Sequence, residues 1–249
     1  GHAGARAMVE DGLFERFPCD RVFAFHNWPD LPAGTVSTRP GPIMAAADKF
    51  EILVEGRGGH AAMPHKTPDA ILAASDLVTQ LNGLVSRRIP PMSTAVLSVT
   101  QIEGGSSHNV LPAAVRVVGT VRTFDIAVQD RIEEALRQVA EGVALASGTR
   151  MTVTYQRYYP ATINDAAAAD EALAAAAGVA RAELAPEPAF TSEDFAFMLQ
   201  ACKGAYLWLG QGRGDADVPL HHPRYDFNDD VLGIGIRLHV ALVERHLSI

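Results

Sequence analysis

The stretch RVFAFHNWP, residues 21–29, decides how we interpret this sequence. The mostly apolar run from Arg21 to Phe25 predicts a short strand buried on both faces, as is typical of an α/β sheet. Ligand-binding groups collect at the carboxyl ends of such strands. His26 stands at that end, and Asn27 follows as a residue that can orient a neighbour. Two explanations stay open for His26: it closes the strand by bonding to backbone, or it binds a ligand.

A second pair of histidines follows another apolar strand near the other end of the chain. Residues 205–209, with the sequence AYLWL, predict a buried strand, and a glycine-rich acidic loop leads from it to His221 and His222. Histidines delivered from strand ends of one sheet can converge, and imidazole is the commonest metal ligand. The alternative is two surface histidines in a polar loop, which their spacing does not exclude.

Composition limits the classes of protein to consider. The 249 residues are 48% hydrophobic and 20% charged, which predicts a globular chain of one large or two moderate domains. The net charge of −8, without a basic patch, argues against a nucleic-acid partner. No apolar run is long enough for a membrane span. Cys19 and Cys202 lie far apart without a CxxC motif, so we expect a reduced, cytoplasmic protein with two free thiols.

The segment 47–159 predicts a complete small domain that is inserted into the first one. Its expected elements are strands over 49–57, 94–102, 114–123 and 150–158, a helix that starts at 67–69 and a helix that ends at Gly148. The resulting βαββαβ order is the ferredoxin-like pattern. Two helices cover only one face of a four-stranded sheet, and edge strands expose backbone, so we expect this domain to pair with a copy of itself.

The remaining residues, 1–46 and 160–249, are expected to form the other domain together. The sequence predicts helices over 166–181 and 231–246 and a proline- and glycine-rich loop over 29–42. Ser192 is expected to cap a short helix, with Glu193 and Asp194 as first-turn charges rather than catalysts. Because Ser192 lacks a G-x-S-x-G context, the sequence argues against a serine hydrolase.

Two polar residues of the inserted domain are candidates for substrate contacts. His60 lies in GRGGHAAMPH, residues 56–65, where glycines allow close approach of a backbone or ligand. The alternative is a turn that needs glycine, with His60 merely solvated. Asn109 ends the loop GGSSHN and can present its amide to a carbonyl or carboxylate, or it can be a turn residue that bonds to backbone. Arg122 is a candidate partner for an acid on the sheet.

Seven stretches taken in order resemble one family. They are GARAMVEDGLFE (4–15), FAFHNWP (23–29), GRGGHAAMPH (56–65), GGSSHNVLP (104–112), GTVRTF (119–124), SEDFA (192–196) and LHHPRYDFND (220–229). The set strongly resembles the M20 metallopeptidase family, in its amidohydrolase branch of hippurate hydrolases and N-acyl-amino-acid or auxin-conjugate hydrolases. The resemblance covers essentially the whole chain.

The resemblance implies a metal-dependent amidohydrolase that cleaves the amide bond of small N-acyl amino acids or peptide-like substrates. It implies two divalent metal ions, zinc or manganese, in the full-length protein. His26 and His221 match family metal ligands, and His222 fills a variable position. The implied fold is α/β: a partial three-layer α/β/α catalytic domain with an inserted ferredoxin-like lid.

For the segment 47–159, the resemblance implies a lid or dimerisation domain and therefore a homodimer. His60 matches the lid histidine that reaches the partner subunit's active site and polarises the substrate carbonyl. Asn109 matches the lid asparagine that lies near the substrate. These two residues are therefore the expected catalytic groups of this chain.

The chain departs from the family pattern at its start. Family members carry an upstream region with a Cys-x-His pair and then a Glu-Glu pair, which supplies the general base and a metal ligand just ahead of the segment that opens this sequence. Amide hydrolysis needs an activated water, a carboxylate base and stabilisation of the oxyanion. The sequence is expected to lack both pairs, and we therefore expect an inactive C-terminal fragment. The alternative function is a non-catalytic dimerising module.

Overall fold

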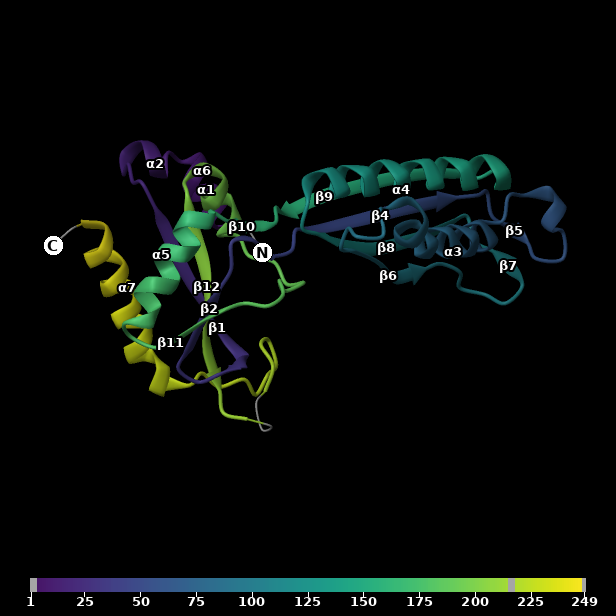
Figure 1. Cartoon of the computed structure of the whole chain (residues 1–249). Helices are drawn as coiled ribbons and strands as arrows, with labels where there is room; N and C mark the ends of the chain where they lie inside the picture. Colours follow the sequence, from purple (N-terminus) through teal and green to yellow (C-terminus); the bar gives the residue numbers. More distant parts are fainter. Residues whose placement is uncertain (1–3, 215–217, 248–249) are drawn as a thin grey trace. The chain divides into compact units, whose positions relative to one another are not determined.

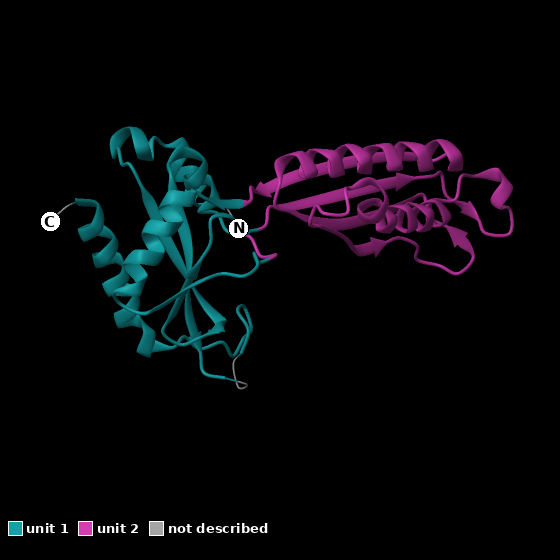
Figure 2. Cartoon of the chain, viewed as in Figure 1, with its two compact units in different colours: residues 1–44, 162–189, 193–249 teal, residues 45–161, 190–192 magenta. Residues whose placement is uncertain are grey.

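A computed structural model describes residues 4–214 and 218–247, which fold as a mixed α/β chain of two compact units (Figure 1, Figure 2). Unit 1 comprises Gly1–Met44, Thr162–Ala189 and Glu193–Ile249, and unit 2 comprises Ala45–Ala161 and Phe190–Ser192. The sequence predicted a division into 1–46 with 160–249 and 47–159. The functional roles of the two units, and their description as a partial three-layer domain with a ferredoxin-like lid, stay predictions.

Unit 1 is built on a four-stranded sheet in the order β1-β12-β2-β11. Its strands are β1 (Val22–Pro32), β12 (Gly204–Gly212), β2 (Thr35–Thr38) and β11 (Arg181–Leu184). β1 and β12 are parallel, with His26 opposite Trp208, so both strands finish at the same end of the sheet. β12 is buried from Gly204 to Gln211, as its apolar sequence predicts.

Two helices cover one face of this sheet: α5 (Ala166–Ala177) and α7 (Leu232–Leu247). Phe23 and Phe25 of β1 pack on this side, in a core with alanines of α5 and leucines of α7. Small alanine side chains let α5 approach the strands closely. The side chain of Asp165 caps α5 by accepting a hydrogen bond from the amide of Ala168 at 3.0 Å.

The opposite face holds a second core in which Trp28 stacks on Trp208, with ring centroids 4.4 Å apart. Ile43, Met44 and Phe195 complete this core. The neighbouring elements are the antiparallel pair β3 (Gly41–Met44) and β10 (Thr162–Asn164), and the short helices α1 (Gly4–Glu10), α2 (Leu13–Arg16) and α6 (Ala196–Ala201). His26 stands two positions from Ala24 and two from Trp28 along β1, so it lies on the same, second face.

Unit 2 contains an antiparallel sheet in the order β6-β8-β4-β9. Its elements in chain order are β4 (Ala47–Glu55), β5 (Gly59–His60), η1 (Pro64–Lys66), α3 (Ala70–Arg88), β6 (Ala95–Glu103), β7 (Val110–Leu111), β8 (Ala114–Thr123), α4 (Ile126–Ser147) and β9 (Arg150–Tyr159). α3 and α4 pack on one face of the sheet around Phe50, Ile52 and Val54, which are fully buried. Asp69 caps α3, and Gly148 ends α4 with a positive φ of 68°.

Three local predictions outside the segment 47–159 were wrong. The predicted loop 29–42 contains the end of β1, all of β2 and the start of β3. The predicted helix 166–181 ends at Ala177, because Arg181–Leu184 pairs with β2 instead. Ser192 does not cap a helix, since α6 begins at Ala196 without a side-chain cap. None of the helices within residues 4–214 and 218–247 combines the length and the apolar character that crossing a bilayer requires.

Candidate functional site

His26 is half-buried in β1, which runs on to Pro32 instead of stopping at the histidine as predicted. The Nδ1 atom of His26 lies 2.7 Å from the carbonyl oxygen of Asn27. Because a carbonyl oxygen only accepts hydrogen bonds, Nδ1 must carry the ring hydrogen, and the lone pair is left on Nε2. A metal-ligating histidine has the same arrangement, in which a backbone carbonyl fixes the tautomer through the other ring nitrogen.

His221 lies in the exposed loop that follows β12. Its φ of 67° is left-handed, and it is the only non-glycine residue with a positive φ in the described part of the chain. A side chain in this region costs about 1–3 kcal/mol, and such residues cluster at functional sites. The outlier therefore favours a functional role for His221, while its predicted role as metal ligand stays a prediction.

One hydrogen bond ties the two histidine-bearing segments together. The side-chain amide of Asn27 donates to the hydroxyl of Tyr225. Asn27 is the neighbour of His26, and Tyr225 follows His221 by four positions. The structure thus holds the loop of His221 against the strand of His26, at the end of the sheet where β1 and β12 finish (Figure 1).

His222 differs from His221 in its hydrogen bonding. The amide of Arg224 donates to Nδ1 of His222 at 3.1 Å. Since Nδ1 is the acceptor, the neutral ring carries its hydrogen on Nε2, and neither nitrogen keeps a free lone pair. This arrangement argues against His222 as the metal ligand, while the assignment of His221 stays a prediction.

The donor set of the described residues can supply only part of a metal site. Across residues 4–214 and 218–247, no group of three or more His, Cys, Asp and Glu side chains is placed to hold a metal ion. A zinc site takes about three or four protein ligands. His26 and His221 therefore fit a metal site by their chemistry, but a complete coordination shell needs further ligands.

One Glu-Glu pair does occur in this sequence, at Glu133 and Glu134 in α4 of unit 2. Glu133 accepts hydrogen bonds from Arg137 at 2.8 Å and from Arg157 at 2.9 Å. Burial raises its pKa, but the combined effect of the two guanidinium groups is larger and lowers it. This glutamate is a structural ion-pair residue, so the pair does not supply the expected general base.

His60 lies in β5, and Asn109 directly precedes β7; these two strands form a small antiparallel sheet in unit 2 (Figure 1). The amide of Ala61 donates to the carbonyl of Asn109 at 3.0 Å, which places Asn109 beside His60 in the pairing. Both residues are exposed. The structure therefore brings His60 and Asn109 together, although they are far apart in the sequence.

In this two-stranded sheet, the side chains of His60 and Asn109 each keep a hydrogen-bond donor that is not used by the bonds described next. Nδ1 of His60 accepts from the amide of Ala62 at 3.1 Å, so the neutral ring presents Nε2–H. Oδ1 of Asn109 accepts from the hydroxyl of Ser107 at 2.7 Å, which leaves the Nδ2 amide group as donor. Each group is a donor of the kind that can stabilise a developing oxyanion.

Arg122 forms hydrogen bonds with Thr120 and with the carbonyl of Val121, the latter at 3.1 Å. Burial lowers the pKa of Arg122, and the nearby charge of Asp48 partly opposes this shift. The predicted acidic partner thus acts on Arg122 through its charge, while the short-range contacts of Arg122 are to neutral groups.

Glu193 and Asp194 are tied into the structure of unit 1. Asp194 accepts a hydrogen bond from the amide of Ala5 at 2.9 Å, at the start of α1. Glu193 accepts from the hydroxyl of Tyr206 at 2.7 Å. Burial of Tyr206 and the charge of Glu193 raise the pKa of that hydroxyl, so it stays a donor to Glu193. These contacts give both acids structural roles, but neither lies in the first turn of α6, which begins at Ala196, so the prediction of first-turn charges was wrong.

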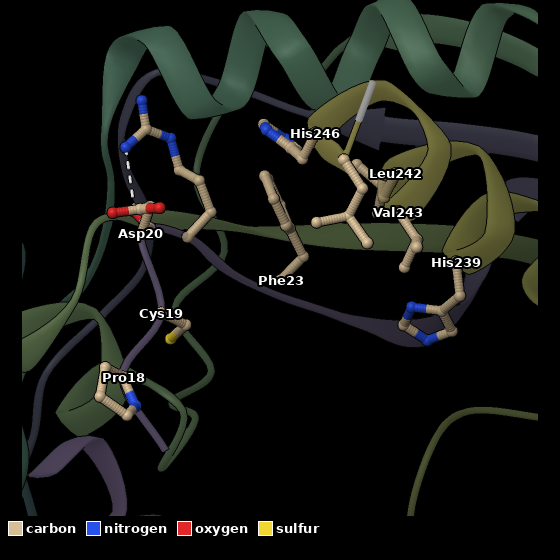
Figure 3. Close-up of a pocket in the computed structure, with 10 residues that line it drawn as sticks. Pro18, Cys19, Asp20, Phe23, His239, Leu242, Val243 and His246 are labelled. Atoms are coloured by element: carbon tan, nitrogen blue, oxygen red, sulfur yellow. Dashed lines mark hydrogen bonds between the residues drawn. The ribbon is translucent and has the colours of Figure 1, made fainter. Parts of the chain in front are cut away.

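A cavity of about 500 Å³ between the start of β1 and α7 was not expected from the sequence (Figure 3). Its lining includes Cys19, Arg21, Phe23, His239 and His246. Phe23 and His246 stack with ring centroids 5.4 Å apart. None of the predicted site residues lines this cavity. Its two walls come from opposite ends of the chain, so only the folded structure reveals it.

Comparisons with known proteins identify relatives along the whole chain. The model of peptidase family M20/M25/M40 matches residues 1–245. N-acetylcysteine deacetylase from Bacillus subtilis (strain 168) is 35% identical over 232 residues, which cover 93% of this chain and 60% of that protein. Hippurate hydrolase from Campylobacter jejuni is 34% identical over 251 residues, which cover 100% of this chain and 65% of that protein.

A solved structure agrees with these relatives. The crystal structure of the Bacillus subtilis YXEP protein, described as a dinuclear metal binding peptidase from the M20 family, matches with a TM-score of 0.82 and 30% sequence identity. The match covers 99% of this chain and 62% of that chain. This chain thus spans between 60% and 65% of the length of the three proteins compared.

Proposed function

Because the chain belongs to peptidase family M20/M25/M40, we propose that it is part of a cytoplasmic, metal-dependent amidohydrolase that cleaves the amide bond of N-acyl amino acids of the hippurate type. The names of two relatives, N-acetylcysteine deacetylase and hippurate hydrolase, support this substrate class. The chain spans 60% and 65% of these two proteins. The activity is therefore proposed for a whole protein of that length, and the chain alone is proposed to be inactive.

The hydrogen bond between Asn27 and Tyr225 is the observation that carries this proposal. It holds the loop of His221 against the strand of His26, whose tautomer leaves Nε2 free to coordinate. Both histidines would hold divalent metal, zinc or manganese, with two ions in the whole protein. When bound, the metal supplies Lewis-acid chemistry that polarises the scissile carbonyl and lowers the pKa of water.

His60 and Asn109 are proposed to act on the substrate carbonyl from unit 2, which serves as a ferredoxin-like lid. The two donors are Nε2–H of His60 and the side-chain amide group of Asn109. Donors fixed in advance stabilise the negative charge that develops on the carbonyl oxygen in the transition state. In the proposed homodimer, this pair serves the active site of the partner subunit.

Zinc binding by the chain tests the metal part of the proposal. We expect weak binding by the wild-type chain, about tenfold weaker binding by His26→Ala and His221→Ala, and no change in His222→Ala, which is the matched control. Titration calorimetry in competition with a chromophoric chelator measures all four proteins. Equal affinity of wild type and His26→Ala would remove His26 from the site.

Hydrolysis assays test the activity separately. We expect no turnover of an N-acyl amino acid series by this chain with added zinc or manganese. The residues proposed for its site include no carboxylate that could act as the general base. A protein of the relatives' length is expected to hydrolyse members of the series. Turnover by the chain alone would contradict its proposed inactivity, whereas an inactive longer protein would contradict the hydrolase assignment.

A second candidate function, a non-catalytic dimerising module, is favoured by the edge of the unit 2 sheet. β6 ends the strand order, and within the described residues it pairs with β8 alone. Val96 and Ile102 on this strand are 37% and 56% exposed. Sedimentation at several concentrations tests this candidate: a dimer without bound metal favours it, and a strict monomer eliminates it.

A further inference from the structure

Two cysteines that stand 183 positions apart in the sequence meet at the start of the unit 1 sheet. Cys19 precedes β1, and Cys202 follows α6 directly ahead of β12. Since β1 and β12 are adjacent and parallel, with Val22 opposite Gly204, the segments that lead into them lie side by side. The Sγ atoms are 3.7 Å apart. The sequence predicted two unrelated free thiols, because linear spacing does not reveal this approach.

The backbone around Cys19 can make the small movement that a covalent bond needs. A disulfide has an S–S distance of about 2.0 Å, so the two sulfur atoms must approach by less than about 2 Å. Cys19 lies in an irregular segment between α2 and β1, outside any helix or strand. Cys202 is held more firmly, since its amide donates to the carbonyl of Met198 at 2.8 Å. Cys19 is therefore the member of the pair with the less constrained backbone.

The surroundings of the two thiols give them different roles in an exchange reaction. Cys19 is exposed and lines the cavity of about 500 Å³ beside β1, so a small reagent can reach its sulfur (Figure 3). Cys202 is half-buried, and its thiol points at the carbonyls of Cys19 and Lys203, both at 3.5 Å. Burial raises the pKa of Cys202 to about 11, so it stays protonated at neutral pH. Cys19 is thus the thiol that reacts first.

We propose that Cys19 and Cys202 are a redox modification site that forms a reversible intramolecular disulfide by exchange with a low-molecular-weight disulfide such as oxidised glutathione. The Cys19 thiolate attacks one sulfur of the reagent, forms a mixed disulfide and expels one glutathione thiolate. Cys202 then loses its proton, attacks the Cys19 sulfur and expels the second glutathione. Two protein thiols are oxidised while one reagent disulfide is reduced to two thiols.

The cross-link would join the entry points of β1, which carries His26, and of β12, which leads into the loop of His221. It would also close a very long loop in the unfolded chain. Disulfides that close long loops restrict the unfolded state most, in the chain-entropy account of their effect. The oxidised chain is therefore expected to unfold at a higher temperature than the reduced chain.

Incubation of the 249-residue chain with oxidised glutathione, followed by a thiol count and intact mass, tests the proposal. We expect both thiols to disappear without retained glutathione mass, a Cys19–Cys202 linked peptide in a non-reducing digest, and full recovery with dithiothreitol. An end product that carries two glutathione adducts, or that is cross-linked between chains, would overturn the proposal.

Single serine variants separate the two roles without depending on the cross-link for folding. Cys202→Ser is expected to stop at a mixed disulfide, with one glutathione on Cys19. Cys19→Ser is expected to react much more slowly, because only the half-buried thiol remains. Oxidant should raise the melting temperature of the wild type and leave that of Cys19→Ser unchanged. An equal rise in both proteins would show that the oxidant acts elsewhere and would count against the pair.

Discussion

The side-chain amide of Asn27 donates a hydrogen bond to the hydroxyl of Tyr225, which follows it by 198 positions. The contact joins the strand of one candidate metal ligand to the loop of the other. Neither partner is a proposed ligand, so both can be changed without removing an imidazole. The consequences of the bond are therefore separable from those of the histidines.

The hydroxyl of Tyr225 is expected to support both stability and metal affinity. Tyr225→Phe removes the acceptor of Asn27 and should lower the free energy of unfolding by about 1 kcal/mol. Because the loop of His221 loses this anchor, zinc affinity should fall by about tenfold. Urea denaturation and calorimetry measure the two effects. Tyr158→Phe is the control, since the exposed Tyr158 bonds through its hydroxyl to Gln156 alone among the residues that the structure describes, and should affect neither quantity.

Gly119 in β8 is expected to tolerate no side chain. A Cβ atom there would lie 2.1 Å from the ring of Phe50 and 2.4 Å from the carbonyl oxygen of Ser98. Because Phe50 is fully buried, Gly119→Ala should lower the free energy of unfolding by about 3 kcal/mol.

Gly83 provides the matched control for this substitution. It lies in α3, and a Cβ atom added there would meet nothing within 4 Å. Gly83→Ala should therefore stabilise the chain by roughly 0.5–1 kcal/mol through helix propensity. Denaturant unfolding of both variants gives the comparison. Equal stability of Gly119→Ala and wild type would show that the unit 2 core can absorb a methyl group.

Asp48 is expected to make stability depend on pH in a defined direction. Its carboxylate is buried and accepts hydrogen bonds from Tyr155 at 2.7 Å and from Gln129 at 2.8 Å. Burial raises the pKa of Asp48 above its ordinary value of 3.8, against the opposing effect of these bonds. The native state therefore binds the proton more tightly than the unfolded state, and this contribution to stability falls as the pH rises from 3.8 through the raised pKa.

The variant Asp48→Ala tests whether the contribution of Asp48 to stability falls with rising pH. The substitution leaves the hydroxyl of Tyr155 and the amide of Gln129 without their acceptor, which should cost about 3 kcal/mol. The variant also lacks the titrating group, so the stability difference from wild type should be largest at low pH and shrink as the pH rises. Urea titrations at several pH values measure the trend; a difference that grows with pH would contradict the raised pKa.

His60 should matter for catalysis and not for folding. Its side chain is exposed, so His60→Ala should change the free energy of unfolding by less than about 0.5 kcal/mol. In a protein of the relatives' full length, loss of the Nε2–H donor should lower kcat by about 10²–10³-fold. His65→Ala, which changes an exposed histidine of η1, is the control. Similar kcat values for the two variants would show that His60 does not stabilise the oxyanion.

Elements with a strong local signal could be predicted from the sequence. The strand predicted over 114–123 has the observed limits of β8, Ala114 and Thr123. The end of α4 was marked by Gly148, which adopts the left-handed conformation that glycine allows. In both cases the information lies within a few neighbouring residues, and the tertiary structure agrees with it.

The missed strands β2, β3 and β11 have at most four residues each, and distant partners determine them. Thr35–Thr38 is a strand because it lies between β12 and β11. The end of α5 did have a local signal, since Gly178 directly follows the last helical residue. The alanine-rich run around Gly178 concealed it.

The ordered motifs were enough to predict the family and the four candidate residues, but not their surroundings. Backbone geometry determines the tautomer of His26, the positive φ of His221 and the donor that His60 presents. The approach of Cys19 to Cys202 depends on the parallel pairing of β1 and β12. Such relationships link residues through the fold, and a linear pattern does not contain them.

The antiparallel pairing of β3 with β10 brings the two ends of the segment 45–161 close together. Met44 lies opposite Thr162, so the two points where unit 2 enters and leaves are neighbours, with Cα atoms about 5 Å apart. A two-residue turn can span that gap, and residues 45–161 could be exchanged as a cassette for a short hairpin or for a foreign module. Phe190, which also belongs to unit 2 and whose ring centroid lies 5.2 Å from that of Phe124, would lose this partner in such an excision.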